Sequence, residues 1–330
     1  MGIRRSLRPA AIVAGLAISI LFAYVAVRDV DWSLFWKSLS ASTLWWLFPA
    51  LAVLAGGISV RAVRWQLLFA PATRQPLGAT TRALLVGTFL NLVLPARPGE
   101  VLRVFYLHDE AGTSRAEGLG TALTERIYDV LGLLVLLFVA TPWLPNVTWL
   151  HRAAVLAIVA ALLLAAVVGA LLLWQERPVR YLIGPLAHVP GVSRERLDPI
   201  AANLAEGLIA LRRRRSALIA LALTFAAILA IALSFWLVTF ALHLGVPFGA
   251  ALLVMVATNL AMILPSSPAA IGVFEAATLV ALRPYGVDAS RALSYAVVLH
   301  ALTFVPFVLI GLVLLQRRGL QLLRRPEQEA

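Results

Sequence analysis

Residues 91–100 read NLVLPARPGE, and residues 259–275 read NLAMILPSSPAAIGVFE. Both stretches run from an asparagine through apolar residues to a Leu-Pro-x-x-Pro sequence, and then to a glycine and a glutamate. Proline removes an amide donor and clashes with the preceding turn, so an apolar helix must break in each stretch. Broken backbone at membrane depth leaves polar groups unpaired unless protein or a water-filled cavity surrounds it. Each stretch therefore predicts a helix–loop–helix hairpin that dips into a membrane.

The composition of the whole chain is that of a membrane protein. Hydrophobic residues make up 61% of its 330 residues and charged residues 13%, against roughly half and a quarter in soluble proteins. Several apolar runs reach the ~20 residues that span a bilayer, which excludes a soluble globular protein. The net charge of +12 would suggest nucleic acid in a soluble protein. Here the arginines flank apolar runs, so we expect anionic lipid and no nucleic acid as partner.

We expect an all-α integral membrane protein with six full transmembrane helices and two re-entrant helical hairpins, eight hydrophobic units arranged as an inverted repeat. The spans are expected at residues 10–27, 44–60, 119–140, 153–174, 217–242 and 293–315, and the hairpins at 83–107 and 250–282. The first repeat covers residues 1–150 and the second 151–330, with a cytoplasmic connector at 175–216. The expected helix-break residues are Asn91, Pro95, Pro98, Gly99, Asn259, Pro265, Pro268 and Gly272. Hairpin arms that crossed the membrane fully would leave the sidedness unchanged.

Charge bias predicts the sidedness of this layout. With the N-terminus inside, the expected cytoplasmic segments hold 20 of the 28 lysine and arginine residues, and the outer loops hold five. Arg61 and Arg64 are counted in a cytoplasmic loop after the second span. This excess of cytoplasmic charge predicts a multi-pass protein of the cytoplasmic membrane with both termini in the cytoplasm.

Charged residues inside the expected membrane segments are candidates for a site, because each costs roughly 2.5–3.5 kcal/mol at the centre of a span. Glu125 and Asp129 are four residues apart and share a helix face, while Arg126 points elsewhere. Two interpretations remain open for them. They form a structural ion pair with Arg103 or Arg97, or they hold arginines in place for an anionic headgroup.

The first break combines several groups that suit a phosphate. Arg97 and Arg103 flank Gly99-Glu100, where the amides of a half-helix N-terminus carry partial positive charge. An arginine fork beside such amides binds phosphate well, although arginines that only set topology remain the alternative. At the second break, Ser266 and Ser267 either donate to the same ligand or cap the freed backbone.

Two further polar residues belong to the second half. Glu275 lies one turn into the half-helix after the second break and is expected to be shielded from lipid, and His300 lies inside the last span as a ligand or a packed core residue. The predicted lipid- or phosphate-binding residues are Arg97, Arg103, Arg126, Ser266, Ser267 and His300. The residues predicted to orient these arginines or to couple to protons are Glu100, Glu125, Asp129 and Glu275.

Motifs for other chemistries are missing from the sequence. It has no zinc-protease helix, no serine nucleophile elbow, no P-loop and no Rossmann glycine fingerprint. Without cysteine it can hold no disulfide, Cys-ligated zinc, iron–sulfur cluster or thiol nucleophile. We therefore expect no enzyme, no cofactor and no metal site, and any transport must be passive, gradient-driven or driven by a partner.

The hairpin motifs resemble the lysylphosphatidylglycerol synthase transmembrane family, the flippase-like region of the multiple peptide resistance factor, over about residues 10–315. The resemblance rests on residues 91–100 with Arg103, on Glu125-Arg126 with Asp129, and on Leu264-Pro265 with Gly272 and Glu275. It implies translocation of an anionic or modified phospholipid, a glycosylated polyprenyl phosphate or a hopanoid between leaflets. Some relatives add a soluble aminoacyltransferase domain; this chain stops at Ala330, so that activity is not expected. Relatives often carry arginine where this chain has His300, which leaves that position open.

The leading hypothesis is thus a lipid flippase-like transporter whose hairpins rock to open the site to each face in turn. Its partners would be membrane lipids, with membrane proteins or a synthase as further candidates and no predicted oligomeric state. One alternative is a membrane glycosyltransferase using a polyprenyl-phosphate donor, since Asp29 and Asp31 in the first outer loop resemble the acidic pair of such enzymes. A small-solute or ion transporter with the same inverted repeat is the other.

Overall fold

The computed structural model describes residues 16–94, 97–141, 213–262 and 267–324, with isolated positions between 155 and 166. Within these residues every regular element is helical. The expected span 153–174, the connector 175–216 and the repeat boundary at 150 lie almost entirely outside the described residues, as do Pro95, Pro265 and Ser266.

Three long helices form the framework of the bundle. They are α3 (Leu47–Leu68), preceded by the short helix η1 (Leu44–Trp46), α10 (Arg214–Ala241) and α13 (Ala289–Arg324). Each contains a stretch long and apolar enough to cross a bilayer, at Leu44–Leu68, Arg214–Ala241 and Ala289–Arg317. The prediction of an all-α membrane protein is therefore confirmed. The number of spans and the inverted repeat stay predictions.

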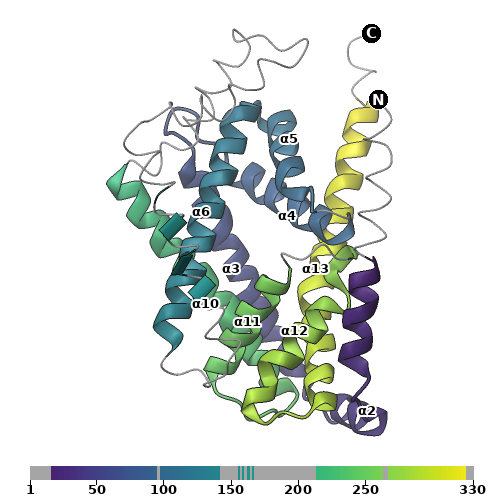
Figure 1. Cartoon of the computed structure of the whole chain (residues 1–330). Helices are drawn as coiled ribbons and strands as arrows, with labels where there is room; N and C mark the ends of the chain where they lie inside the picture. Colours follow the sequence, from purple (N-terminus) through teal and green to yellow (C-terminus); the bar gives the residue numbers. More distant parts are fainter. Residues whose placement is uncertain are drawn as a thin grey trace, which may run out of the picture.

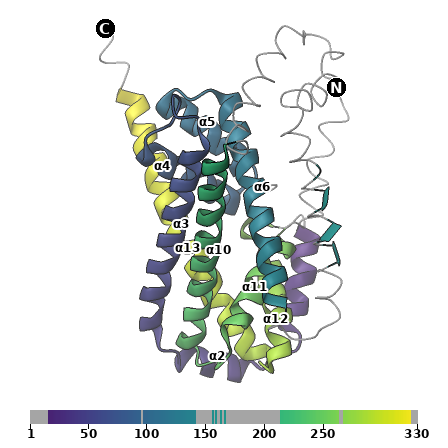
Figure 2. The same cartoon turned by 90° about the vertical axis from the view of Figure 1, so that its left-hand side faces the viewer.

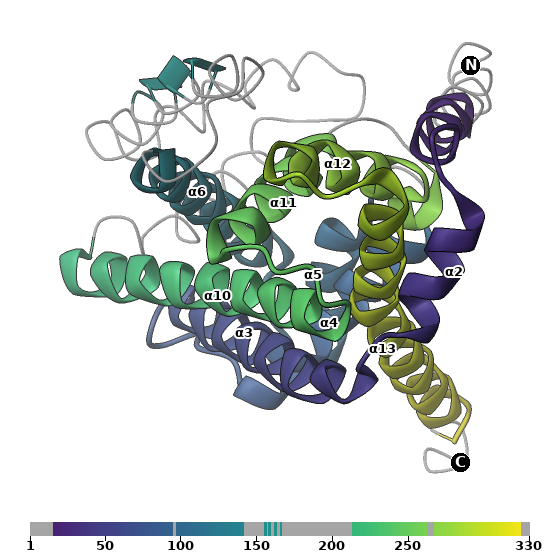
Figure 3. The same ribbon diagram turned by 90° about the horizontal axis from the view of Figure 1, so that it is seen from below.

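Helices α3 and α10 pack side by side in opposite directions (Figures 2 and 3). Gly57 permits this approach, because a Cβ there would lie 3.2 Å from the Cβ of Ala230. One turn after Ala230 on α10, the Ser234 hydroxyl donates to the carbonyl of Ala50 on α3 at 2.8 Å. The end of α3 therefore lies beside the first half of α10, which places Arg64 of α3 next to Thr224 of α10.

Two helical pairs occupy opposite ends of the bundle (Figure 1). The first is α4 (Leu77–Val93) with α5 (Gly99–Ala111), and the second is α11 (Phe248–Ala261) with α12 (Val273–Leu282). The helices break where the sequence predicts, but the outer arm of the first pair begins at Leu77 rather than residue 83, directly after Pro76. The short helix η5 (Pro268–Ala270) lies within the second break and contacts α4. Re-entry of these pairs into a membrane remains a prediction.

The remaining helices complete the bundle around these pairs. Helix α6 (Arg115–Ala140) covers the expected span 119–140 and is capped by the Ser114 hydroxyl, which accepts from the Glu117 amide. A shorter apolar helix, Leu16–Val27, ends where the first expected span ends. Helix α2 (Trp32–Ser40) lies along the outside of α13 (Figure 3).

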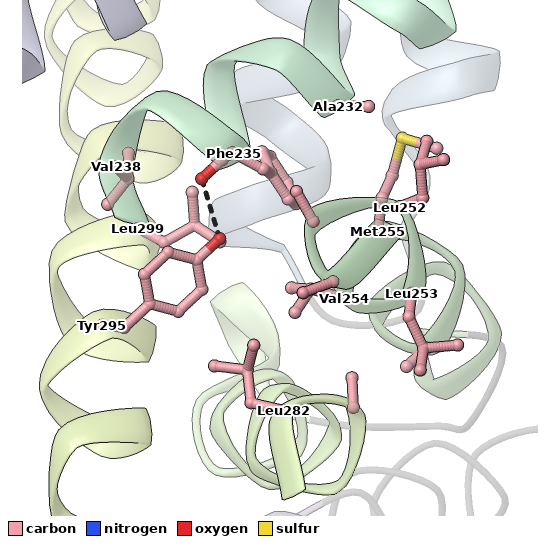
Figure 4. Close-up of a cluster of buried hydrophobic side chains, with 14 of the residues drawn as sticks. Ala232, Phe235, Val238, Leu252, Leu253, Val254, Met255, Leu282, Tyr295 and Leu299 are labelled. Carbon is pink, nitrogen blue, oxygen red and sulfur yellow. Dashed lines mark hydrogen bonds between the residues drawn. The ribbon is translucent and has the colours of Figure 1, made fainter. Parts of the chain in front are cut away.

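Two hydrophobic cores stabilise the fold. One joins α10, α11, α12 and α13, and Figure 4 shows the Tyr295 hydroxyl donating to the Phe235 carbonyl within it, at 2.9 Å. The other joins α3, α4, α5 and α6 around Trp65. The charged site described below lies on the second core.

One expected boundary is wrong. Arg61 and Arg64 do not lie in a loop, because α3 continues to Leu68. The segment 61–68 reads RAVRWQLL and contains no proline or glycine to end the helix, while ion pairs offset the cost of burying its arginines. The expected last span, 293–315, lies within α13, which runs from Ala289 to Arg324 with Pro306 inside it.

Candidate functional site

Glu125 of α6 lies at the centre of a cluster of charged side chains drawn from three helices. Its Oε1 lies 3.0 Å from Arg64 Nη2 and 3.3 Å from Arg61 Nη2, and its Oε2 lies 2.7 Å from Arg103 Nη2. The Glu125 side chain is fully buried. Three guanidinium groups thus converge on one buried carboxylate, the arrangement that makes a buried charge tolerable.

Asp129 extends the cluster by one helical turn. Its carboxylate lies 2.7 Å from Arg64 Nη2, 3.8 Å from Arg61 Nη2 and 3.7 Å from Arg126 Nη1. Because Glu125 and Asp129 are four residues apart, both face α3, as the sequence predicts. The carboxylates of α6 therefore hold two arginines of α3.

Arg64 and Arg103 each make several contacts with protein groups, although the buried Nε of each has no hydrogen-bond partner among the described residues. Arg64 also donates to the Thr224 hydroxyl of α10 at 2.8 Å. Arg103 pairs with Glu100 at 2.8 Å and lies 4.4 Å above the Trp65 ring. Both guanidinium groups are buried. The structure thus shows Glu125 paired with Arg103, a contact that both interpretations of Glu125 and Asp129 include. The role of Arg103 in binding a lipid phosphate stays a prediction.

Arg126 differs from the other arginines of the cluster, because 47% of its side chain is exposed. It bonds Glu100 of α5, and its charge interacts with those of Arg61, Arg64 and Arg97. Among the residues that the structure describes, Arg61, Arg64, Arg103 and Arg126 pair with three carboxylates, those of Glu100, Glu125 and Asp129. These seven side chains, called the arginine cluster below, carry one uncompensated positive charge, and Arg126 is its accessible member.

The first break is closed by Asn91. Its side-chain oxygen accepts from the Gly99 amide at 2.7 Å, and its nitrogen donates to Glu100 Oε1 at 3.3 Å. Gly99 is required there, because a Cβ would overlap the carbonyl oxygen of Gly87. Pro98 precedes the first residue of α5, where its missing amide costs no helical hydrogen bond. The Asn91 side chain thus accepts a hydrogen bond from an amide that has no helical partner at the start of α5.

The tip of the first pair reaches the second. Arg97 has a left-handed backbone, with φ at 51°, and its Nη1 donates to the carbonyl of Met262 at 3.1 Å. Met262 follows the last residue of α11, where carbonyl groups lack helical partners and attract cations. The two breaks therefore meet through the contact of Arg97 with Met262.

The second break is closed differently. Glu275 Oε2 accepts from the Gly272 amide at 2.6 Å, and its Oε1 lies 2.6 Å from His300 Nδ1. Asn259 donates to the Met255 carbonyl of its own helix at 2.8 Å. The Ser267 hydroxyl contacts carbonyls within its own loop, as expected of a backbone cap. Pro268 begins η5.

Sequence reasoning missed Arg61 and Arg64 as members of the site. Their spacing of three residues, with Trp65 beside them and no helix breaker until Pro71, was the available signal. The acidic pair of the first outer loop is engaged elsewhere: Asp31 caps α2, and Asp29 pairs with Arg28. In the described part of the chain, no group of three or more acidic or histidine side chains is placed to hold a metal ion.

Residues 12–311, which include the arginine cluster and both breaks, match the family model described as the lysylphosphatidylglycerol synthase TM region. The chain belongs to this family. It is also similar to a UPF0104 membrane protein of Methanocaldococcus jannaschii, with 22% identity over 252 residues that cover 73% of this chain and 99% of that protein. The family resemblance noted from the sequence is thereby confirmed. Membership in the lysylphosphatidylglycerol synthase transmembrane family establishes a membrane protein.

Proposed function

We propose that the chain is a lipid flippase-like transporter, which moves a phospholipid, polyprenyl-phosphate-linked or related lipid across the cytoplasmic membrane. The observation that carries this proposal is Arg126, a half-exposed cation in a cluster with one surplus positive charge. Such a charge among membrane helices calls for an anionic partner. A lipid phosphate fits, since guanidinium groups bind phosphate oxygens in pairs.

The depth of the cluster supports a lipid headgroup. Arg64 and Arg61 lie four and seven residues before the end of the stretch Leu44–Leu68, about 6 and 10 Å along the helix axis. The other end of this stretch carries Trp46, which stacks on Phe240 at 5.1 Å, as in an interfacial aromatic belt. The cluster is thus near the membrane surface that the charge bias assigns to the cytoplasm, where headgroup phosphates of the inner leaflet lie.

The carboxylates of the cluster prepare the arginines for the ligand. Glu100, Glu125 and Asp129 hold the guanidinium groups in place before a ligand binds. The binding of a phosphate would therefore cost little side-chain entropy. Desolvation of the headgroup is the main barrier to crossing a bilayer, and a polar path between the two pairs of half-helices would lower it. Alternating access would follow if the pairs move against each other, as in other inverted repeats.

One alternative loses support from the structure. A glycosyltransferase would need the carboxylates of the first outer loop as base or metal ligands, but Asp31 is engaged in capping α2. A small-solute transporter shares the geometry of the site, so competition by soluble anions without competition by lipids would identify it. We assign no enzymatic activity to the chain.

Replacement of Arg126 tests the proposal. In proteoliposomes that contain a fluorescent phospholipid, Arg126→Ala should abolish translocation while the protein still purifies as a folded species. Loss of this partner should weaken lipid binding by about 10–100-fold, since a hydrogen bond to a charged group contributes about 1.5–3 kcal/mol. The matched control is Arg82→Ala, because Arg82 is also half-exposed but pairs with Glu110, outside the cluster. Undiminished translocation by Arg126→Ala would contradict the assignment.

A further inference from the structure

Glu275 and His300 form a second ionisable pair, remote in sequence from the arginine cluster. His300 Nδ1 and Glu275 Oε1 are 2.6 Å apart, and the two side chains are 12% and 13% exposed. The pair joins the half-helix α12 to the long helix α13. Unlike the arginines, which stay charged at every physiological pH, histidine gains and loses a proton near neutrality.

The pair lies deep within a membrane-spanning stretch. His300 is eleven residues from the start of Ala289–Arg317, about 17 Å along the helix axis. The Phe274 ring lies 4.7 Å from the His300 ring, and the Phe304 ring lies 6.1 Å from it. Ionisable groups at such depth are costly and mark ion or proton pathways.

Charged groups on the surrounding helices lie elsewhere among the described residues. On α4, Arg82 pairs with Glu110. Helix α10 has Arg214 and Arg215 as its first two residues. Helix α2 has Lys37 and the capping residue Asp31. On α13 itself, Arg291 donates to the His243 carbonyl. Arg97 lies at Met262, and the first helix adds only Tyr24. Glu275 is the one charged group whose contact with His300 the described structure shows.

We propose that the Glu275–His300 pair binds the proton that couples lipid movement to a transmembrane proton gradient, an inference that rests on the proposed transport function. With the imidazole neutral, Nδ1–H donates to the carboxylate, Nε2 carries a lone pair, and the pair has one negative charge. A proton that binds Nε2 forms an imidazolium and leaves the pair without net charge. The proton thus removes a charge that the middle of a bilayer disfavours.

The same carboxylate connects the proton to the backbone of the second break. Glu275 accepts from the Gly272 amide at the start of α12. Gly272 also contacts the first helix closely, since a Cβ there would lie 2.5 Å from the Ser19 carbonyl oxygen. Protonation strengthens the hold of His300 on Glu275 and fixes α12 to α13; release of the proton loosens α12. This gives the half-helix two states that differ by one proton.

A pH gradient across proteoliposomes tests the coupling. One proton per lipid at a difference of one pH unit should give a steady-state lipid ratio between leaflets of about ten, because each unit is tenfold in proton activity. His300→Arg keeps the cation but cannot release a proton, so its ratio should fall to about one. Wild-type protein that translocates lipid without responding to the gradient would overturn the coupling and leave the transport function intact. Absence of wild-type translocation would overturn the transport function itself.

A second measurement does not depend on transport. In protein labelled with ¹⁵N-histidine, the ring nitrogens of His300 should change protonation state as the pH is lowered, and the signal that is missing from the His300→Gln variant identifies this ring. A His300 ring that keeps one protonation state would overturn the proposal, as would a His300→Arg variant with the wild-type lipid ratio.

Discussion

Arg64 and Glu125 form an ion pair of 3.0 Å in which both side chains are fully buried. It joins the second turn from the end of Leu44–Leu68 to the middle of α6, and two further arginines share the same carboxylate. A buried pair of this kind is a weak source of net stability, because desolvation offsets the attraction. Replacement of one partner alone is nevertheless costly, because the other charge stays buried without a counter-ion.

Glu125→Gln should destabilise the protein by about 3–5 kcal/mol, because it leaves Arg61, Arg64 and Arg103 without their shared counter-ion. Chemical unfolding in detergent, followed by the near-UV signal of the tryptophans, measures the change. The matched control is Glu110→Gln, which breaks a pair with the half-exposed Arg82 and should cost less than about 1 kcal/mol. Equal effects of the two substitutions would show that the cluster is not the buried network described above.

Cross-linking of the two breaks should stop transport. The chain has no cysteine, so Arg97→Cys with Met262→Cys introduces one defined pair where Arg97 reaches Met262. A short cross-linker should block translocation of lipid in proteoliposomes, and cleavage of a reducible linker should restore it, provided that the half-helices separate during transport.

The matched control for that experiment is Thr43→Cys with His243→Cys. Their side chains form an exposed contact, with 3.1 Å between Thr43 Oγ1 and His243 Nε2, where the residue before η1 meets the end of α10. The proposed motion leaves this contact in place. Cross-linking there should retain translocation. Full activity of the cross-linked Arg97–Met262 pair would contradict movement of the breaks relative to each other.

Gly99→Ala should disrupt the first break. Its methyl group would overlap the Gly87 carbonyl and approach the Asn91 side chain to 2.7 Å, and overpacking of this kind costs about 1–3 kcal/mol or more. Gly56→Ala is the control, because Gly56 lies inside α3 with no atom near its missing Cβ. Alanine there should stabilise the helix by up to about 1 kcal/mol. Thermal unfolding of both variants measures this, and a neutral Gly99→Ala would refute the close packing.

Asp31 should act as a helix cap without a role in chemistry. Hydrogen bonds from the Ser33 hydroxyl and the Leu34 and Ser33 amides hold its pKa below the ordinary value. Because the pKa of Asp31 is lower in the folded state than in the unfolded state, its carboxylate contributes its full stabilisation of α2 above about pH 3.9. This stabilisation is lost as the pH falls through the folded-state pKa. The protection of the α2 amides against exchange should therefore stay constant from neutral pH down to the folded-state pKa of Asp31, and fall below it.

Substitutions of Asp31 complete this test. Asp31→Ala should accelerate amide exchange at Ser33 and Leu34 at neutral pH, whereas Asp31→Asn keeps a side-chain acceptor and should not. Both variants should translocate lipid. Loss of function in Asp31→Asn, with Arg126→Ala silent, would favour the glycosyltransferase alternative.

Local sequence features predicted the helix breaks well. Pro98 and Pro268 act through the backbone of their own turns, and the position of Glu125 and Asp129 on one face follows from helix geometry. The end of α3 was predicted poorly, because two arginines resemble a loop boundary when their partners are unknown. The sequence could not show that Asn91 bonds across its break to the Gly99 amide, because that contact depends on how α4 and α5 pack.

The sequence by itself determined that this chain is a helical membrane protein with two interrupted segments, because hydrophobic length and proline geometry are properties of single stretches. The tertiary structure alone decided which charges meet. Arg61, Arg64, Arg103 and Glu125 are supplied by three helices, and packing of α3 against α10 and α6 brings them together. The strength of an ion pair depends on distance and burial, neither of which spacing along the chain specifies.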